Sequence, residues 1–479
     1  MLEFLHASTP EKLLALLTLA GFVLPVLAYF AFVHQYSVNV VVADQWSDVT
    51  LAGKAFSGHL TFADLWAQHN ENRILFPNLI VLLLAYTTHL NLRIETFISA
   101  VLLVGSVALM IWTHRRRSPS TPLIWYCPVA ILMFTWAQYE NALWGFQIAW
   151  YLVMICLLGT LSVLDRKHLN GLSLAAAAAI AAIGSFSSLQ GLLIWAAGFL
   201  LLLYRRRSWQ ALAAWAIVAI AIACVYLYHF NNSPLGYYRI NPLHHPFNVV
   251  KLFLFSLGNI AGKPLPINVL ALPDQNHPLL GAASPWIILF GVLILIAIAG
   301  AVVKAGFRNA RDGSEAFGVT LILFALAFDG LTAIGRGLYG YPAVSASRYT
   351  TYDVLALVGA YLVVISRRSP ARTQARRASV GFPIRAWGSR DVEKAIALAV
   401  RALPVVILIC VFITAVSGYR NGLTGGRNDH SVRIEAAKVI RNYRSEGSNI
   451  TFVVYQSRAA TVRLIRIAEQ DKLSLFAPP

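Results

Sequence analysis

Apolar runs follow one another along most of this chain, and short polar segments separate them. Spanning the hydrocarbon core of a bilayer takes about 20 mostly apolar residues in a helix, which satisfies its own backbone hydrogen bonds where no water is present. The pattern therefore predicts about eleven membrane-spanning helices. They are expected near Leu13–Val33, Thr96–Trp112, Leu123–Trp136, Phe146–Leu164, Leu172–Phe186, Leu189–Tyr204, Ala211–His229, Trp286–Val303, Phe317–Ile334, Val354–Ile365 and Ile396–Val416.

Two further apolar runs are expected to lie at the membrane surface instead of crossing it. Ile74–Ala85 is short and contains Pro77, and counting it as a span would turn the arginines at 115–117 to the opposite face. Val249–Ile260 would reverse the orientation of every later helix if it crossed. We therefore expect an interfacial helix at 74–85 within a first external loop at 35–94. The second such helix falls within an external segment at 230–283.

The composition agrees with an all-α membrane protein. Of the 479 residues, 58% are hydrophobic and 13% are charged, and the mean hydropathy is +0.63. These values lie outside the range of soluble globular domains. The first apolar run lacks a signal-peptide cleavage site before the polar loop, so it is expected to remain as the first span.

The location of the basic residues decides how the net charge of +18 is interpreted. They occur in short clusters between apolar runs, which is the pattern of the positive-inside rule and not of a nucleic-acid groove. Most of them fall on the side of the N-terminus. We therefore predict a cytoplasmic N-terminus, an external C-terminus and a bacterial inner (plasma) membrane as the location, with no nucleic-acid partner.

Two parts of unequal size are expected. Residues 1–419 would form the transmembrane domain, and residues 420–479 would form a small external tail. The tail is too short for a large independent domain. A cap on the outer face is the expected arrangement, because anionic lipid headgroups attract its basic residues.

The first external loop carries unusual polar residues. Asp44 and Asp48 have the i, i+4 spacing that places two carboxylates on one face of a helix, and a carboxylate at the membrane boundary can act as a general base toward a hydroxyl. Alternatively, they are hydrated residues that end a helix. His69, Glu71 and Arg73 precede the expected interfacial helix. The alternatives are a capping histidine and an arginine that pairs with Glu71 or Asp48.

A second group of polar residues lies between the third and fourth predicted spans. Glu140 brings another acid to the side of Asp44, with Asn141 beside it. Trp144 offers a flat surface of the kind that stacks on sugars, and Gln147 follows at the start of the next span. The alternative is an interfacial aromatic belt with an exposed Glu140.

A third group lies between the ninth and tenth predicted spans. Arg336 and Arg348 stand among glycines and hydroxyl residues, with Tyr349 next to the second arginine. Guanidinium groups bind phosphate oxygens in pairs of hydrogen bonds, and glycines let the backbone approach an anion. The alternative is that the arginines pair with Asp329 or Asp353.

Together, these residues resemble the GT-C superfamily of membrane glycosyltransferases, which includes protein O-mannosyltransferases and sugar transferases of lipid A and O-antigen. The resemblance rests on the acidic first loop, the stretch from His69 to Phe76 before an interfacial helix, and the Glu140-Asn141 motif. The chain departs from the mannosyltransferases after His69, where Asn70-Glu71-Asn72-Arg73 replaces a proline pair.

The resemblance implies a GT-C-like bundle and an inverting transfer of sugar from a polyprenyl-phosphate carrier to an acceptor hydroxyl on the non-cytoplasmic face. The acceptor would be a glycan, a lipid or a protein, and some family members use a divalent cation. Asp44 would be the base, and Arg336 and Arg348 would hold the lipid phosphate. The expected catalytic residues are Asp44, Asp48 and Glu140, and the expected substrate-binding residues are His69, Glu71, Arg73, Asn141, Trp144, Gln147, Arg336, Arg348 and Tyr349.

The competing class is a transporter or flippase of a lipid-linked or small polar solute. Such proteins carry ionisable residues at mid-membrane and often internal repeats. Asp329 lies deep in a predicted span, but the sequence shows no clear two-fold repeat and its carboxylates cluster at one face. This distribution favours the glycosyltransferase.

Overall fold

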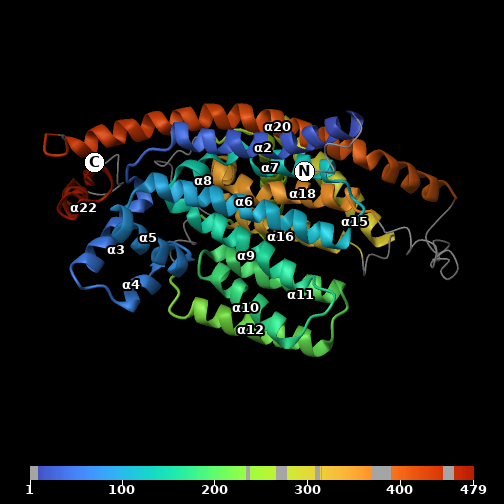
Figure 1. Ribbon diagram of the computed structural model, residues 1–479, viewed down its shortest axis with the longest axis horizontal. Helices are drawn as coiled ribbons and strands as arrows, with labels where there is room; N and C mark the ends of the chain where they lie inside the picture. The colour runs from blue at the N-terminus through green and yellow to red at the C-terminus, as the bar shows by residue number, and fades with distance from the viewer. Residues whose placement is uncertain are drawn as a thin grey trace.

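The computed structural model describes residues 9–232, 238–265, 278–307, 313, 315–367, 390–445 and 458–478. Most of the described chain is helical, and many helices run along the long axis of the molecule (Figure 1). The first half contains α2 (Thr9–Tyr36), α3 (Trp46–Phe56), α4 (Phe62–Trp66), α5 (Leu75–Thr88), α6 (Leu92–Arg117), α7 (Cys127–Met133), α8 (Tyr139–Leu143), α9 (Ile148–Leu164), α10 (Gly171–Ser185), α11 (Leu193–Tyr204) and α12 (Trp209–Leu227). The second half contains α14 (Pro246–Gly258), α15 (Pro285–Phe307), α16 (Glu315–Gly335), α17 (Gly340–Val344), α18 (Thr350–Ile365), α20 (Arg390–Arg441) and α22 (Arg458–Gln470).

Short 3-10 turns and one small hairpin connect these helices. The turns are η1 (Ala43–Gln45), η2 (Leu123–Tyr126), η3 (Trp136–Gln138), η4 (Gly145–Gln147), η5 (Leu189–Leu192), η6 (Asn259–Ala261), η8 (Gly337–Tyr339), η9 (Ser347–Tyr349) and η12 (Ser474–Phe476). Strands β1 (Gln68–His69) and β2 (Asn72–Arg73) pair in antiparallel fashion within the first loop.

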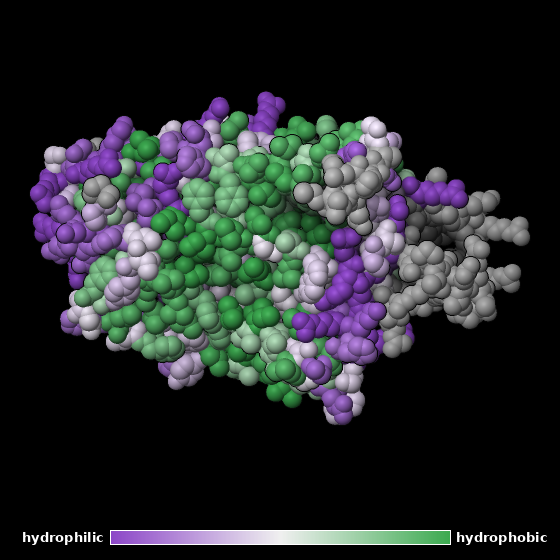
Figure 2. Space-filling view, viewed as in Figure 1, coloured by the Kyte–Doolittle hydropathy of each residue, from purple (hydrophilic) through white to green (hydrophobic). Residues whose placement is uncertain are grey.

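Among the described residues, eight helical segments are long and apolar enough to cross a membrane, so the chain is a multi-pass membrane protein. They are Thr9–Tyr36, Leu92–Arg117, Gly145–Leu164, Trp209–Leu227, Pro285–Gly306, Glu315–Gly335, Ser347–Ile365 and Arg401–Arg441. A broad hydrophobic band lies between two hydrophilic ends of the molecule (Figure 2). α18 is buried along almost its whole length and packs against α16, so these two helices form the centre of the bundle.

Three of the eleven predicted spans are too short in the structure to count as full spans. The run Leu123–Trp136 divides into η2, the seven-residue α7 and η3, and Thr135 caps the last of these turns. α10 has 15 residues and begins at the Asn170 cap. α11 has 12 residues after η5. Local capping side chains and turns interrupt the apolar runs, and hydropathy alone does not detect such interruptions.

The last apolar helix does not end near residue 419, where the tail was expected to begin. α20 continues without interruption to Arg441. A Cβ on Gly422 would lie 2.1 Å from the Trp136 backbone, and one on Gly425 would lie 2.2 Å from the Tyr139 ring. These glycines therefore let α20 pack closely against η3 and α8, a gain that offsets their low helix propensity.

The end of the chain packs on the first loop. α22 contacts α3, and Ser474 donates a backbone hydrogen bond to the His89 carbonyl at 2.8 Å. Buried residues of the tail, such as Ile440 and Ile465, share one hydrophobic cluster with Trp46 and Leu90. In Figure 1, α22 accordingly lies beside α3 at one end of the molecule. We call this the loop end.

Candidate functional site

Charged side chains from three distant segments meet at the loop end. Asp44 lies 3.7 Å from Nε2 of His69. Glu71 forms an ion pair with Arg336, and Glu140 lies 3.5 Å from Arg348. We call this set the charged cluster, and its members are Asp44, His69, Glu71, Glu140, Arg336 and Arg348.

The first loop presents its members through tight turns. Asp44 lies in η1, directly after Ala43, whose φ of 51° turns the chain sharply. His69 ends β1, and the hairpin turns through Asn70 in the left-handed region, a conformation that asparagine tolerates well. Glu71 therefore lies at the tip of the hairpin, where it reaches Arg336.

The two arginines lie at facing ends of the central helix pair. Arg336 directly follows α16, and Arg348 lies in η9 just before α18. The Arg348 backbone N–H donates to Glu140 at 2.9 Å, and the Asn141 amide donates to the Arg348 carbonyl at 2.8 Å. The Glu140 backbone N–H in turn donates to Ser347 at 3.0 Å. Glu140 and Asn141 thus fix the turn that carries Arg348.

Positive groups surround the carboxylate of Asp44, whose side chain is 50% exposed. His69 holds the pKa of Asp44 below its ordinary value, although burial opposes this effect, and the charges of Arg348 and Arg336 lower the pKa further. Asp44 is therefore ionised at neutral pH. Asp44 lies close enough to both predicted phosphate-binding arginines for their charges to act on it.

Asp48 has a different environment from Asp44. It lies in the first turn of α3 instead of sharing one continuous α-helix with Asp44, and it is 2% exposed. Burial raises the pKa of Asp48 well above its ordinary value, and the nearby acids Glu95 and Asp44 raise it further. The pKa values of the two first-loop carboxylates are therefore shifted in opposite directions.

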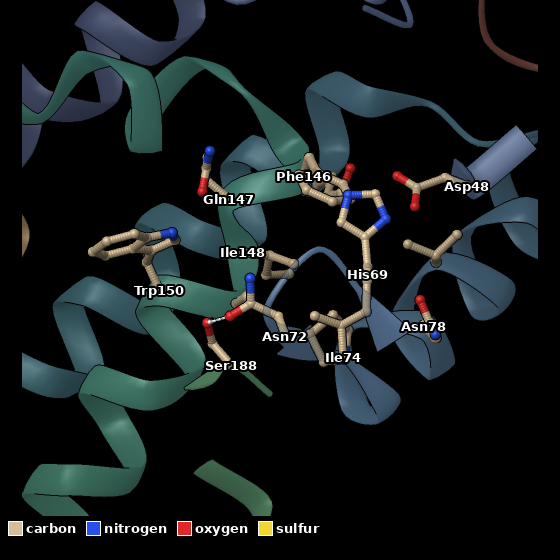
Figure 3. Close-up of a pocket in the computed structure, with 14 residues that line it drawn as sticks. Asp48, His69, Asn72, Ile74, Asn78, Phe146, Gln147, Ile148, Trp150 and Ser188 are labelled. Carbon is tan, nitrogen blue, oxygen red and sulfur yellow. Dashed lines mark hydrogen bonds between the residues drawn. The ribbon is translucent and has the colours of Figure 1, made fainter. Parts of the chain in front are cut away.

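A small pocket of about 50 Å³ opens between His69 and the start of α9. Its volume suits a few water molecules. His69 lies between Asp48 and Phe146, and Asn72 accepts a hydrogen bond from Ser188 at 2.8 Å (Figure 3). The polar lining residues are Asp48, His69, Asn72, Asn78, Glu95, Gln147 and Ser188. Of the predicted site residues, Asp48, His69 and Gln147 therefore lie at this pocket.

Three other predicted residues make contacts within the protein. Arg73 is 3% exposed, and its guanidinium donates to the carbonyls of Trp66, Tyr226 and Tyr228. It therefore holds the first loop against the end of α12. The Trp144 ring lies 5.9 Å from the Arg433 guanidinium, so α20 partly covers its face.

Tyr349 is the third of these residues. It is 5% exposed and packs against Trp150 and Phe328, and the Arg348 guanidinium lies 5.2 Å from its ring. The buried Tyr349 ring therefore supports the Arg348 side chain within the charged cluster.

Glu95, Asn72 and Asn78 are neighbours of the site that were not predicted from the sequence. Glu95 is fully buried and accepts a hydrogen bond from Gln45 at 3.2 Å. A Cβ on Gly145 would overlap the Glu95 carboxylate, so the glycine of η4 makes room for this side chain. In the sequence, Glu95 directly precedes the predicted span Thr96–Trp112, and an acid in that position could have indicated a functional residue.

Within the described ranges, no group of three or more His, Cys, Asp or Glu side chains is arranged to hold a metal ion. The carboxylates of the charged cluster are instead near arginines: Glu71 pairs with Arg336 and Glu140 with Arg348. These residues do not fit the divalent cation that the family resemblance would allow.

Replacing Asp48 by Asn is expected to stabilise the protein at neutral pH. A carboxyl with a raised pKa binds its proton more tightly in the folded state, so folding stability falls as pH rises from the ordinary value of 3.8 toward the folded value. Asparagine does not ionise. Differential scanning fluorimetry at pH 7 should show a melting temperature higher by a few degrees, corresponding to ~1 kcal/mol, and this gain should shrink toward pH 4.

Glu435→Gln is the control for this prediction, because Glu435 is a surface acid of α20 that is 62% exposed. Its melting temperature should match the wild type at each pH. A lower melting temperature for Asp48→Asn across the whole range would show that the ionised carboxylate is needed for folding.

No family model, curated protein or solved structure matches the chain. A functional assignment therefore has to be argued from the arrangement of its own residues.

Proposed function

We propose that this protein is an inverting glycosyltransferase that moves a sugar from a polyprenyl-phosphate carrier to an acceptor hydroxyl. The observation that carries the proposal is the charged cluster. Asp44, Arg336 and Arg348 come from segments far apart in the chain and lie together at one end of a membrane-spanning bundle. This combination provides a base and a phosphate-binding pair at one place.

The arginines would bind the phosphate of the donor. Their side chains are 25% and 29% exposed, so both remain accessible from the surface. A guanidinium has five N–H donors, and one carboxylate partner does not use all of them. Glu71 and Glu140 would hold Arg336 and Arg348 in place before the donor arrives, and the positive charges would stabilise the leaving phosphate.

Asp44 would accept the proton of the acceptor hydroxyl. The acceptor oxygen then bonds to the anomeric carbon, the bond from that carbon to the phosphate oxygen breaks, and its electron pair leaves with the polyprenyl phosphate. Attack opposite the leaving group inverts the anomeric centre. An ionised carboxylate that is half-exposed suits this role, because it is already deprotonated when the acceptor binds.

The same proposal includes the sidedness expected from the sequence. The charged cluster would face the non-cytoplasmic side of a bacterial plasma membrane, with the N-terminus in the cytoplasm. The pocket beside His69 would adjoin the sugar, and Trp144 and Gln147 would lie near it. The acceptor would be a glycan, a lipid or a protein.

The stereochemistry of the product tests this mechanism. The purified protein is incubated with a polyprenyl-phosphate sugar of known anomeric configuration, and the product is analysed by nuclear magnetic resonance. The proposal requires the opposite configuration in the product. Retention would exclude direct attack on the donor and would require a covalent sugar intermediate.

Replacing His69 by Phe should move the acid limb of the pH profile of kcat/KM to higher pH. His69 is the largest cause of the lowered pKa of Asp44, so its removal lets that pKa rise toward its ordinary value and more of the base is protonated at acidic pH. The activity retained at about pH 4, relative to activity at about pH 7, should be lower in the variant than in the wild type. An acid limb identical to that of the wild type would show that His69 does not influence the pKa of the catalytic base. His59→Gln, an exposed histidine of the same loop, is the control.

One observation favours a transporter as the second candidate. Asp329 and Asp353 are buried within α16 and α18 and lie close enough to each other to interact electrostatically. Ser256 donates a hydrogen bond to Asp329 at 2.9 Å. Paired ionisable residues inside a membrane bundle often mark a proton or solute path. Solute uptake by reconstituted vesicles without any donor lipid would support this candidate over the glycosyltransferase.

A further inference from the structure

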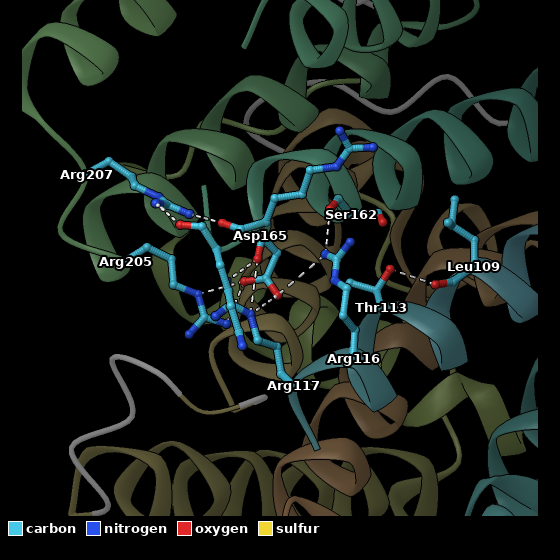
Figure 4. Close-up of polar contacts among 10 residues, drawn as sticks. Leu109, Thr113, Arg116, Arg117, Ser162, Asp165, Arg205 and Arg207 are labelled. Carbon is cyan, nitrogen blue, oxygen red and sulfur yellow. Dashed lines mark hydrogen bonds and ion pairs between the residues drawn. The ribbon is translucent and has the colours of Figure 1, made fainter. Parts of the chain in front are cut away.

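A second charged group lies at the end of the bundle opposite the charged cluster. α6 and α9 begin near the cluster and run away from it, and the link between α11 and α12 meets their far ends. There the buried carboxylate of Asp165 lies 2.6 Å from Arg205, 3.2 Å from Arg117 and 4.0 Å from Arg116 (Figure 4). Arg207 lies beside them and donates to the Lys167 carbonyl at 3.0 Å. We call the four arginines the arginine cluster.

Positive charge exceeds negative charge in this region. Asp165 is its central acid. The second acid is the buried Glu315, which interacts electrostatically with Tyr204, the residue directly before Arg205. The basic residues are Arg115, Arg116, Arg117, Arg166, Lys167, Arg205, Arg206 and Arg207. Among the described residues of this region, these two carboxylates do not neutralise the eight basic side chains, so the described part carries a net positive charge.

Several guanidinium N–H groups of this region are buried without an acceptor among the described residues. They are Nε of Arg115, Arg116 and Arg207. Other N–H groups of these arginines bind carbonyls at helix ends, as Arg116 does with Ser162 at 2.7 Å. Burial lowers the pKa of Arg207, and the nearby charges of Arg117 and Arg205 lower it further. A buried N–H group without an acceptor is costly, so a bound anion that accepts these hydrogen bonds would be favourable.

The surface beside the arginine cluster is apolar and aromatic. Trp112 is 52% exposed, and the Arg116 guanidinium lies 4.7 Å from its ring. Trp209, which is 74% exposed, follows Arg207 by two residues, and Leu203 is also exposed. Tryptophans with this exposure are typical of the membrane interface, where lipid headgroups meet acyl chains. A soluble anion would gain nothing from these side chains.

We propose that the arginine cluster binds the phosphate of an anionic phospholipid, whose acyl chains lie along the exposed surface of Trp112, Leu203 and Trp209. The phosphate supplies the counter-charge that Asp165 alone does not provide. Binding at this end joins the ends of α6, α9 and α11. The proposal is independent of the transferase activity, because the charged cluster lies at the other end of these helices.

Lipid binding to the full-length protein in detergent tests the proposal. Phosphatidylglycerol and phosphatidylcholine are titrated separately, and bound lipid is counted by native mass spectrometry. The wild type should bind phosphatidylglycerol far more tightly. The double variant Arg116→Gln/Arg207→Gln should bind it about 25-fold more weakly, since one basic side chain near a membrane surface contributes about fivefold. This variant keeps Arg117 and Arg205, the closest partners of Asp165.

Two matched variants make the result specific. Arg116→Lys/Arg207→Lys keeps both charges and should recover most of the affinity, even if the glutamine variant folds poorly. Arg441→Gln/Arg463→Gln removes two exposed charges at the loop end and should retain wild-type affinity. Equal losses in the two glutamine pairs would mean diffuse attraction and would overturn the site.

Inorganic phosphate provides the last comparison. At millimolar concentration it should not displace phosphatidylglycerol, because it lacks the acyl chains that contact the aromatic surface. Displacement by phosphate alone would show that the site takes a soluble anion and would overturn the lipid assignment.

Discussion

Asp44→Asn is expected to reduce kcat for sugar transfer by a factor of 10² to 10⁴, the range that a general base contributes. The amide keeps the size of the side chain but does not accept the proton of the acceptor hydroxyl. Donor binding should persist, because both arginines remain. The measurements are kcat from the release of polyprenyl phosphate, and donor affinity by isothermal titration.

Asp64→Asn is the control for this variant, because Asp64 belongs to the same loop but pairs with Lys54 away from the charged cluster. It should keep activity within a few-fold of the wild type when the two proteins are equally folded. Full activity of Asp44→Asn would exclude Asp44 as the base and leave Asp48, in the adjacent pocket, as the candidate base.

Arg336→Ala should weaken donor affinity by about 10- to 100-fold, because a hydrogen bond to a charged group contributes about 1.5–3 kcal/mol. A loss of kcat is also expected, because Arg336 would stabilise the charge of the leaving phosphate. Affinity for a polyprenyl-phosphate sugar is measured with the full-length protein in nanodiscs.

Glu71→Gln tests whether Arg336 acts by binding phosphate or only by pairing with Glu71. Like Arg336→Ala, this variant breaks the Glu71–Arg336 ion pair, but it keeps the arginine and removes a negative charge near the donor. Donor affinity should be retained or should rise. Equal losses in Arg336→Ala and Glu71→Gln would mean that the ion pair only maintains the loop structure.

The sequence was sufficient to predict the class of fold. Apolar run length predicts spans such as α6 and α15 because few alternatives bury so many apolar residues. It does not predict where α7 ends, since the Thr135 cap and the adjoining turn are local features. It also does not predict that α20 continues past its glycines, because the close contact with Trp136 depends on tertiary packing.

The proximity of some of the candidate residues was predictable from the sequence. The position of each acid and arginine relative to the apolar runs placed Asp44, Glu140 and Arg348 on one side, and the structure brings them together. The partners of the arginines were not predictable. Arg336 pairs with Glu71, 265 residues away, instead of with Asp329 or Asp353. Those two aspartates lie inside helices and close to each other, a proximity that sequence spacing does not reveal.

The central claim is that the charged cluster transfers sugar from a lipid phosphate. The most direct measurement uses purified wild-type protein in vesicles that contain a polyprenyl-phosphate sugar labelled in the sugar, together with a membrane extract as the source of acceptor. Labelled sugar should move to the acceptor, and free polyprenyl phosphate should appear in equal amount. Neither change should occur with Asp44→Asn. Equal rates of transfer by the wild type and Asp44→Asn, or no transfer from any polyprenyl-phosphate sugar, would contradict the claim.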